Sequence, residues 1–371
     1  MNLDVATPVL VDRVARARAQ MEAEGVDVLL LSTGPDLPYL TAYAAMPLER
    51  LTMFVLPRDG EATLVVPRLE APRVVERPEV FSIVPWGETE DPIDVVAHLA
   101  KGAGVAAIGD HTWARFLVDL LGAMPATTFR RANGVVSPIR MRKDAAEIAA
   151  LRAAGAAADR VAAQLQGGAI PMAGRTEASV SAELSRRLLV EGHDRVNFAI
   201  VGSGPNGASP HHSASQRVLQ RRDLVVCDFG GRMNGYCSDI TRTVAVGEPL
   251  AEVAEAYAVL LEAQQAAVAA AVVGTPCEEV DAVARRIIDA GGFGERFIHR
   301  TGHGIGMEAH EDPYIVSGNA LSLQPGHAFS VEPGIYVAGR WGLRLEDIVI
   351  ATADGPDPMN RVRHDLVVVD A

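Results

Sequence analysis

The chain has 371 residues, of which 49% are hydrophobic and 22% are charged, which excludes global disorder and suggests two or three domains. Its 47 acidic residues outnumber its 34 basic residues, so the net charge is −13. Because an acidic chain repels phosphate backbones and the sequence has no local basic patch, we expect no nucleic-acid partner.

Cysteine content and hydropathy indicate the compartment. The three cysteines, Cys227, Cys237 and Cys277, form no CxxC pair, and their odd number fits a reducing compartment better than a disulfide framework. The sequence begins without the basic and apolar regions of a secretion signal. The longest uncharged apolar stretch, residues 263–277, is too short to span a membrane. We therefore expect a cytoplasmic protein that binds no membrane.

The first half of the chain alternates between helical and strand-like patterns. The helical pattern at Val9–Glu24 ends at Gly25, and the apolar run Val26–Leu31 that follows is typical of a buried strand. Further strands are expected at Met53–Leu56, Ala62–Val66, Phe81–Val84 and Val105–Ile108, and helices at Leu69–Glu76, Pro92–Lys101 and Trp113–Leu121. This alternation predicts an α/β domain over residues 1–138.

The second half, residues 139–371, has a different organisation. Helices are expected at Asp144–Gln166, Glu177–Glu191, Ala251–Val272 and Cys277–Ala290, and strands at Asn197–Val201 and Asp223–Phe229. After Gly291 the sequence is rich in glycine and strand-like to its end. Helices packed on a mostly antiparallel sheet would make this second domain α+β.

An acidic pair lies on a predicted hairpin of the second domain. Asn234-Gly235 is the strongest short hairpin signal, and a two-residue turn there pairs Asp228 with Thr241 and Gly230 with Asp239. The two aspartates then become diagonal neighbours on one face, with backbones about 7–8 Å apart. Gly230, which has no side chain, is expected to leave open space between them.

Two carboxylates on one face point either to a cation or to solvent. Asp228 follows the apolar run Leu224–Cys227, which places it at least partly inside the protein. Two buried carboxylates repel each other, so protonation or a cation must neutralise one of them, and a metal ion or metal pair is the natural solution. The alternative at this point is a pair of solvated aspartates on an exposed hairpin face.

Two pairs of histidines stand out. His303 and His310 belong to the glycine-rich segment Thr301–Pro313, whose glycines prevent a stable helix and allow close backbone approach. A histidine on such a segment can be aimed into a cleft, although a single histidine more often has a structural hydrogen-bonding role. His211 and His212 follow a proline, and by themselves they are typical of a surface loop.

A second acidic pair lies near the end of the chain. A proline follows Glu332 and biases it toward extended geometry, and the Pro-Gly pair there predicts a type II turn. The segment Gly342–Ile350 alternates by two, so Arg344 and Glu346 share one face. A salt bridge between these two residues would explain them structurally, whereas Glu332 beside an apolar strand end is less easily explained that way.

Together these motifs combine four carboxylates with one imidazole, a set that suits two divalent ions. Their order and context resemble the pita-bread metallopeptidases, which include methionine aminopeptidase, aminopeptidase P and Xaa-Pro dipeptidase (prolidase). The motifs that carry the resemblance are SPHH at 209–212, CDFGGRMNGYCSDITRT at 227–243, TGHGIGMEAHEDP at 301–313, VEPGIY at 331–336 and LRLEDIVI at 343–350.

The resemblance covers the whole second half and implies a creatinase-like N-terminal α/β domain joined to an α+β pita-bread catalytic domain. Carried over motif by motif, it implies that Asp228 holds one metal ion, that His303 and Glu332 hold another, and that Asp239 and Glu346 bridge the two. All five positions are intact. Manganese is the first expectation for the ions, with cobalt, zinc and iron as alternatives.

The same resemblance implies a mechanism. A hydroxide that bridges the two metal ions would attack the scissile carbonyl. His310 would help to polarise the carbonyl oxygen, and Glu332 would carry a proton from the water to the leaving nitrogen. His211 would hold the P1′ side of the substrate, and Arg344 would orient Glu346.

The expected function is hydrolysis of the Xaa-Pro bond in dipeptides, and the expected partners are a small peptide with proline at the second position and a second copy of the chain. An aminopeptidase P-type enzyme acting on longer peptides is the main alternative. Methionine aminopeptidase rarely carries such an N-terminal domain. The intact acidic ligands disfavour a creatinase-like amidinohydrolase and a non-enzymatic binding homologue.

Overall fold

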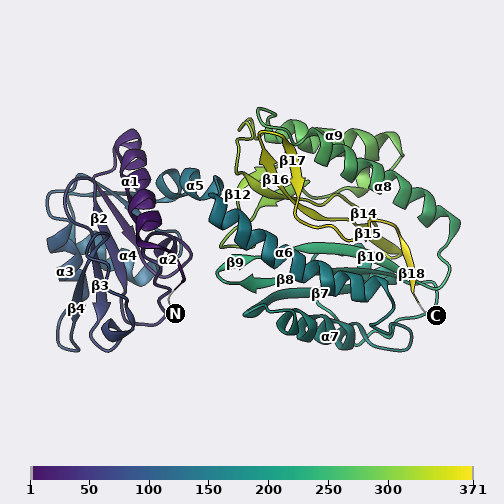
Figure 1. Ribbon diagram of the computed structural model, residues 1–371, viewed down its shortest axis with the longest axis horizontal. Helices are drawn as coiled ribbons and strands as arrows, with labels where there is room; N and C mark the ends of the chain where they lie inside the picture. Colours follow the sequence, from purple (N-terminus) through teal and green to yellow (C-terminus); the bar gives the residue numbers. More distant parts are fainter. Residues whose placement is uncertain (1–2, 370–371) are drawn as a thin grey trace. The chain divides into compact units, whose positions relative to one another are not determined.

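The computed structural model describes residues 3–369 and divides the chain into two compact units, one ending at Arg140 and the other beginning at Met141 (Figure 1). Each unit has its own hydrophobic core. Within residues 3–369, no helix combines the length and the apolar character that crossing a membrane requires.

The first unit is built on a mixed six-stranded sheet with the order β4-β3-β2-β1-β5-β6. Its central strand, β1, pairs antiparallel with β2 and parallel with β5, and it is completely buried. The strands are β1 Val28–Leu31, β2 Met53–Pro57, β3 Thr63–Pro67, β4 Ser82–Trp86, β5 Val105–Ile108 and β6 Thr128–Arg131.

The helices of the first unit begin and end at recognisable signals. Gly25 ends α1 in a left-handed conformation at φ 64°, and the side chain of Asp91 caps the first turn of α3. The helices are α1 Thr7–Glu24, α2 Asp36–Thr41, α3 Pro92–Leu99, α4 Ala114–Ala123 and α5 Asn133–Met141. Apolar side chains of α3 and α4 pack with the sheet in one core, as an α/β domain requires.

Three parts of the first unit differ from the sequence prediction. The helix expected at Leu69–Glu76 is only a 3-10 turn, Ala71–Arg73, because Leu69 is 66% exposed and the segment buries no apolar face. The helix α2 is missed because it is short, with Pro35 just before it and Pro38 within it. The strand β6 was missed because its residues are largely exposed and polar.

The second unit contains two five-stranded sheets and a short two-stranded one. The first sheet has the order β18-β10-β8-β7, with β9 paired to β8, and the second has the order β12-β11-β13-β16-β17. The strands are β7 Arg195–Ser203, β8 Leu224–Met233, β9 Tyr236–Cys237, β10 Ile240–Val246, β11 Gly302–Gly304, β12 Glu311–Ile315, β13 Ala328–Val331, β14 Gly334–Val337, β15 Trp341–Arg344, β16 Asp347–Thr352, β17 Gly355–Pro358 and β18 Val367–Val369. Within residues 141–369, all pairings between these strands are antiparallel except that of β10 with β18.

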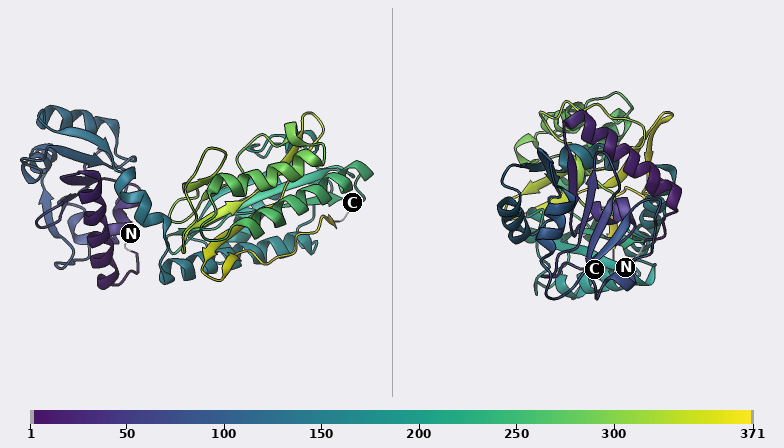
Figure 2. Two further views of the ribbon diagram at one scale, coloured as in Figure 1. Left: turned by 90° about the horizontal axis from the view of Figure 1, so that it is seen from above. Right: turned by 90° about the vertical axis from the view of Figure 1, so that its left-hand side faces the viewer.

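Two pairs of helices cover these sheets. Residues of α6 and α7 share a core with β7, β8 and β10, whereas α8 and α9 share a core with strands β13 to β16. The helices are α6 Ala145–Gln166, α7 Glu177–Val190, α8 Ala251–Ala270 and α9 Cys277–Ala290. The green helices α8 and α9 lie side by side in both Figure 1 and Figure 2. This arrangement is the α+β organisation expected for the second half.

The predicted hairpin is present in its expected register, with one correction. Asp228 on β8 pairs with Thr241 on β10, and the turn at Asn234-Gly235 joins β8 to β9. The expectation that Gly230 leaves open space is wrong, because a Cβ there would lie 2.1 Å from the carbonyl oxygen of Ser238. Glycine is therefore needed so that the two strands can approach closely.

Candidate metal centre and active site

The two aspartates of the hairpin face the interior of the second unit. Asp228 is 8% exposed and Asp239 is 3% exposed, so the alternative of an exposed hairpin face is wrong. In each residue the Oδ1 atom is buried and has no hydrogen-bond partner within the described part of the chain. A buried carboxylate oxygen without a donor is costly, and a cation would remove that cost.

A strand-to-strand contact brings Glu346 to the aspartates. The backbone N–H of Glu346 donates to the carbonyl of Thr241 (3.3 Å), and the Thr241 hydroxyl donates to Glu346 Oε2 (2.7 Å). Because Thr241 also pairs with Asp228 across the sheet, this single threonine links the first sheet to the end of β15. The Glu346 side chain is consequently almost fully buried.

His303 lies on β11, next to the strand β13 that leads to Glu332. The Ser330 hydroxyl accepts from the backbone N–H of His303 (3.0 Å) and donates to Glu332 Oε1 (3.1 Å). The Nδ1 atom of His303 donates to the carbonyl of Gly304 (3.1 Å), which turns Nε2 toward the carboxylates. Nε2 lies 3.1 Å from Glu332 Oε1 and 4.0 Å from Asp239 Oδ2.

Five residues thus form one acidic cluster. Its members are Asp228, Asp239, His303, Glu332 and Glu346. Three overlapping groups of residues each offer ligand atoms that all lie within 4.8 Å of one another. Two of these groups consist of cluster residues only. This donor set of oxygens with one imidazole nitrogen, together with the unpartnered aspartate oxygens, fits hard or borderline divalent cations.

The electrostatics of the cluster also favour a cation. Burial raises the pKa of Asp228 and, much more strongly, the pKa values of Asp239 and Glu346, and the neighbouring carboxylates add to these shifts. Burial opposes ionisation of Glu332 as well, but its contact with His303 brings the pKa down to about 2. Without a cation, burial and the neighbouring carboxylates therefore favour the protonated forms of Asp239 and Glu346.

Arg344, the last residue of β15, contacts Asp228 rather than Glu346. Its guanidinium forms an ion pair with Asp228 Oδ2 and also donates to Thr241 Oγ1 (3.2 Å) and to the Tyr336 hydroxyl (3.0 Å). The structural alternative, a salt bridge between Arg344 and Glu346, is absent from the described residues, and Arg344 reaches Glu346 only through Thr241. Within the acidic cluster, its direct contact is therefore with Asp228.

All the site residues predicted from the sequence line one cavity of about 540 Å³. His211 and His310 are the exposed members, and the ring of His310 lies 3.9 Å from that of His303, between centroids. Burial and the nearby His303 lower the pKa of His310 to about 4, so its imidazole is neutral at pH 7. The Pro-Gly turn after Glu332 is not type II, because Gly334 lies outside the positive-φ region and begins β14 directly.

The structure adds residues to the cavity that sequence reasoning missed. Phe198 and Ile200 alternate along β7 and contribute apolar walls, and His299 and Arg300 precede the segment that carries His303. The period of two within the predicted strand Asn197–Val201 was a signal for the first pair. The second pair lies just before the glycine-rich motif, in a stretch without a periodic pattern.

Comparison with known proteins identifies the family. Residues 149–353 match metallopeptidase family M24, and residues 13–142 match the creatinase/prolidase N-terminal domain. A probable dipeptidase PepE of Mycobacterium tuberculosis is 46% identical over 96% of this chain and 96% of its own length. An Xaa-Pro dipeptidase of Lactobacillus helveticus is 35% identical over 92% of this chain and 95% of its own length. The crystal structure of dipeptidase PepE from Mycobacterium ulcerans aligns with a TM-score of 0.94 and 44% identity, covering 99% of this chain and 100% of that one.

The chain therefore belongs to metallopeptidase family M24. Its fold is the creatinase-like N-terminal domain followed by the pita-bread catalytic domain, as the motifs predicted. The protein is a metal-dependent peptidase.

Proposed function

We propose that this metallopeptidase is an Xaa-Pro dipeptidase whose acidic cluster holds two divalent ions, with manganese as the first choice. We assign the catalytic domain to residues 139–371 and the N-terminal domain to residues 1–138. The observation that carries the proposal is the pair of buried, unpartnered Oδ1 atoms on Asp228 and Asp239 at the wall of a cavity of about 540 Å³. The relatives named as dipeptidases support the substrate class.

The cavity walls suit a substrate with proline at the second position. An Xaa-Pro bond is a tertiary amide without an N–H, so strand-like pairing cannot recognise it. Apolar Phe198 and Ile200 offer a surface for the proline ring, and His211 lies on the same cavity to hold the P1′ side. Recognition would thus depend on shape and on side chains rather than on a backbone hydrogen bond.

The chemistry is divided between the ions and the protein. Two divalent ions, when bound, would supply a Lewis acid for the carbonyl and a water activated at neutral pH. His310, whose pKa of about 4 keeps its imidazole neutral at pH 7, retains one N–H and donates it to the developing oxyanion. Glu332, ionised beside His303, accepts the proton of the attacking water at a carboxylate oxygen and passes it to the leaving nitrogen.

The alternative is an aminopeptidase P-type enzyme that removes the residue before proline from longer peptides. Glu346 follows Glu332 by only 14 positions, which leaves little room for extra loops and favours the dipeptidase. We also propose that the enzyme is a cytoplasmic homodimer. Its three cysteines are free and buried, which suits a reducing compartment.

Metal binding tests the site assignment. Chelator-treated protein titrated calorimetrically with Mn²⁺ should bind two ions per chain and recover peptidase activity, and Asp239→Ala should lose at least one ion together with activity. Asp354→Ala, at the exposed turn between β16 and β17, is the matched control and should behave as the wild type. An Asp239→Ala variant with full activity would overturn the assignment.

A further inference from the structure

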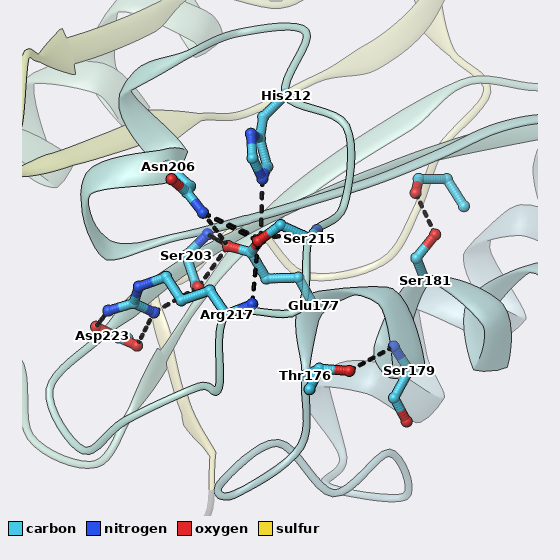
Figure 3. A network of polar contacts seen from close by, with 11 residues as sticks. Thr176, Glu177, Ser179, Ser181, Ser203, Asn206, His212, Ser215, Arg217 and Asp223 are labelled. Atoms are coloured by element: carbon cyan, nitrogen blue, oxygen red, sulfur yellow. Dashed lines mark hydrogen bonds and ion pairs between the residues drawn. The ribbon is translucent and has the colours of Figure 1, made fainter.

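A second buried carboxylate, separate from the acidic cluster, anchors the segment that carries His211. Glu177 is the first residue of α7, and its side chain is 0% exposed. Its hydrogen-bond partners are hydroxyl, amide, backbone and imidazole groups, and all of them come from residues 203–215 (Figure 3).

Both carboxylate oxygens of Glu177 are saturated with donors. Oε1 accepts from the backbone N–H (2.8 Å) and the hydroxyl (2.6 Å) of Ser203. Oε2 accepts from His212 Nε2 (2.9 Å) and from the backbone N–H (3.0 Å) and hydroxyl (2.6 Å) of Ser215. The amide of Asn206 reaches both oxygens at 3.1 Å. Figure 3 shows these groups converging on the carboxylate from several sides.

Backbone hydrogen bonds also connect the start of α7 to the segment that follows His211. The N–H of Glu177 donates to the carbonyl of Arg217 (3.0 Å), and the N–H of Ala178 donates to the carbonyl of Ser215 (2.9 Å). These N–H groups are among those that a helix start leaves without intrahelical partners, and a negative charge is favourable there. Although burial opposes ionisation, the donors lower the pKa of Glu177 to about 2. The carboxylate is therefore a fixed negative centre around which the segment is ordered.

His211 lies on a turn that is held from two sides. The N–H of His212 donates to the carbonyl of Ser209 (3.2 Å), so residues 209–212 form one turn with Pro210 and His211 in its middle. Arg344 donates to the carbonyl of Pro210 (3.1 Å), and Glu177 accepts from the ring of His212. The exposed His211 between these two attachments lines the cavity.

We propose that Glu177 is a positioning residue, which holds the turn at residues 209–212 so that His211 faces the substrate. The inference rests on the proposed substrate contact of His211. A Glu177→Gln substitution keeps the shape of the side chain but places an amide NH₂ group against N–H and O–H donors, which releases part of the segment.

A double-mutant cycle tests the proposal in the full-length, Mn²⁺-loaded enzyme with an Xaa-Pro dipeptide. Glu177→Gln should lower kcat/KM by about 10- to 100-fold, mainly through KM, because a displaced binding group loses orientation. The double variant with His211→Ala should be no worse than His211→Ala alone, because Glu177 acts through His211. Losses that multiply, or a Glu177→Gln variant with wild-type kcat/KM, would overturn the proposal.

Controls separate positioning from general destabilisation. Glu183→Gln removes a carboxylate from the same helix, where it pairs with Arg186 and Arg187, and should leave kcat/KM unchanged. Calorimetric Mn²⁺ binding by Glu177→Gln should keep the wild-type stoichiometry. If Glu177→Gln does not fold, His212→Ala takes its place, because it removes only one of the contacts to Glu177. His212→Ala should lower kcat/KM, and the double variant with His211→Ala should be no worse than His211→Ala alone.

The failure of the proposed function is recognised separately. It would appear as a wild-type enzyme that does not hydrolyse the Xaa-Pro dipeptide in the presence of Mn²⁺, whatever the Glu177 variants do. Unchanged kcat/KM in His211→Ala would instead show that His211 makes no substrate contact. The positioning role has its own measurement, because amide hydrogen exchange of residues 209–212 should accelerate in Glu177→Gln. Unchanged exchange in this turn would overturn the role of Glu177 independently of any substrate.

Discussion

Arg344 joins the turn that carries His211 to the acidic cluster. Its guanidinium contacts Asp228 on one side and the carbonyl of Pro210 on the other, and it is almost completely buried. A planar group with several fixed donors can hold both partners, whereas a lysine ammonium is a point charge on a flexible stem. The position of the Asp228 carboxylate should therefore depend on arginine and not merely on a positive charge.

Arg344→Lys should accordingly weaken Mn²⁺ binding although it preserves the charge. Residues that orient a metal ligand typically contribute 10- to 100-fold in affinity, and we expect a loss of about this size in calorimetry. Arg340→Lys, which alters an exposed ion pair with Glu252, should bind Mn²⁺ as the wild type does. Equal affinities of the Arg344→Lys variant and the wild type would contradict the orienting role.

The raised pKa values of Asp239 and Glu346 predict how stability depends on pH and metal. Because the folded, metal-free protein holds protons that the unfolded chain releases above its ordinary carboxyl pKa of about 4, its stability falls as the pH rises. A divalent ion bound by these carboxylates would take the place of the protons. The increase in Tm on adding Mn²⁺ should therefore be larger at about pH 8 than at about pH 5.5, and an increase that is smaller at the higher pH would contradict this account.

Among the elements, the strand β15 and the 3-10 turn at Gly204–Ala208 pack backbone against backbone. A Cβ at Gly342 would lie 1.8 Å from the carbonyl oxygen of Gly207, so no side chain fits there. The turn that carries His211 follows directly after this contact. The packing of these two elements therefore affects both the stability of the second unit and the position of His211.

Gly342→Ala should lower the free energy of unfolding by about 3 kcal/mol, because the backbones must separate. Gly155→Ala within α6 is the matched control, since its Cβ would make only an ordinary contact of 3.4 Å and alanine favours the helix. Chemical denaturation of both variants measures the difference. Similar stabilities would show that the close contact does not constrain the fold.

The bounds and pairing of some helices and strands could be predicted from the sequence, whereas those of others could not. The hairpin register followed from Asn234-Gly235, and α9 followed from its periodic apolar face with both bounds correct. After Gly291 the individual strands have no predicted bounds, because glycine-rich segments carry little periodic pattern. The exceptions are the strand end at Glu332 and the alternation by two at Gly342–Ile350, which covers most of β15 and β16. For the site, motifs placed the acidic residues in order, but the contact of Thr241 with Glu346 and the burial of Glu177 depend on tertiary packing that no local pattern records.

Across the whole molecule, part of the excess of acidic over basic residues is concentrated in the acidic cluster. Four of the 47 acidic residues belong to the acidic cluster, and two bound divalent ions would change the net charge from −13 to −9. The remaining excess is spread over the chain and still disfavours phosphate backbones. The bulk composition therefore contains one group of carboxylates whose burial fits cations.

The proposed metal-dependent Xaa-Pro dipeptidase activity can be tested by comparing two substrates. The measurement is kcat/KM for an Xaa-Pro dipeptide and for the matching Xaa-Pro-Yaa tripeptide, each with Mn²⁺ and with a chelator. We predict hydrolysis that requires Mn²⁺ and is faster for the dipeptide. Hydrolysis of the tripeptide at least as fast would contradict the dipeptidase assignment, and activity that persists in the chelator would contradict the metal centre.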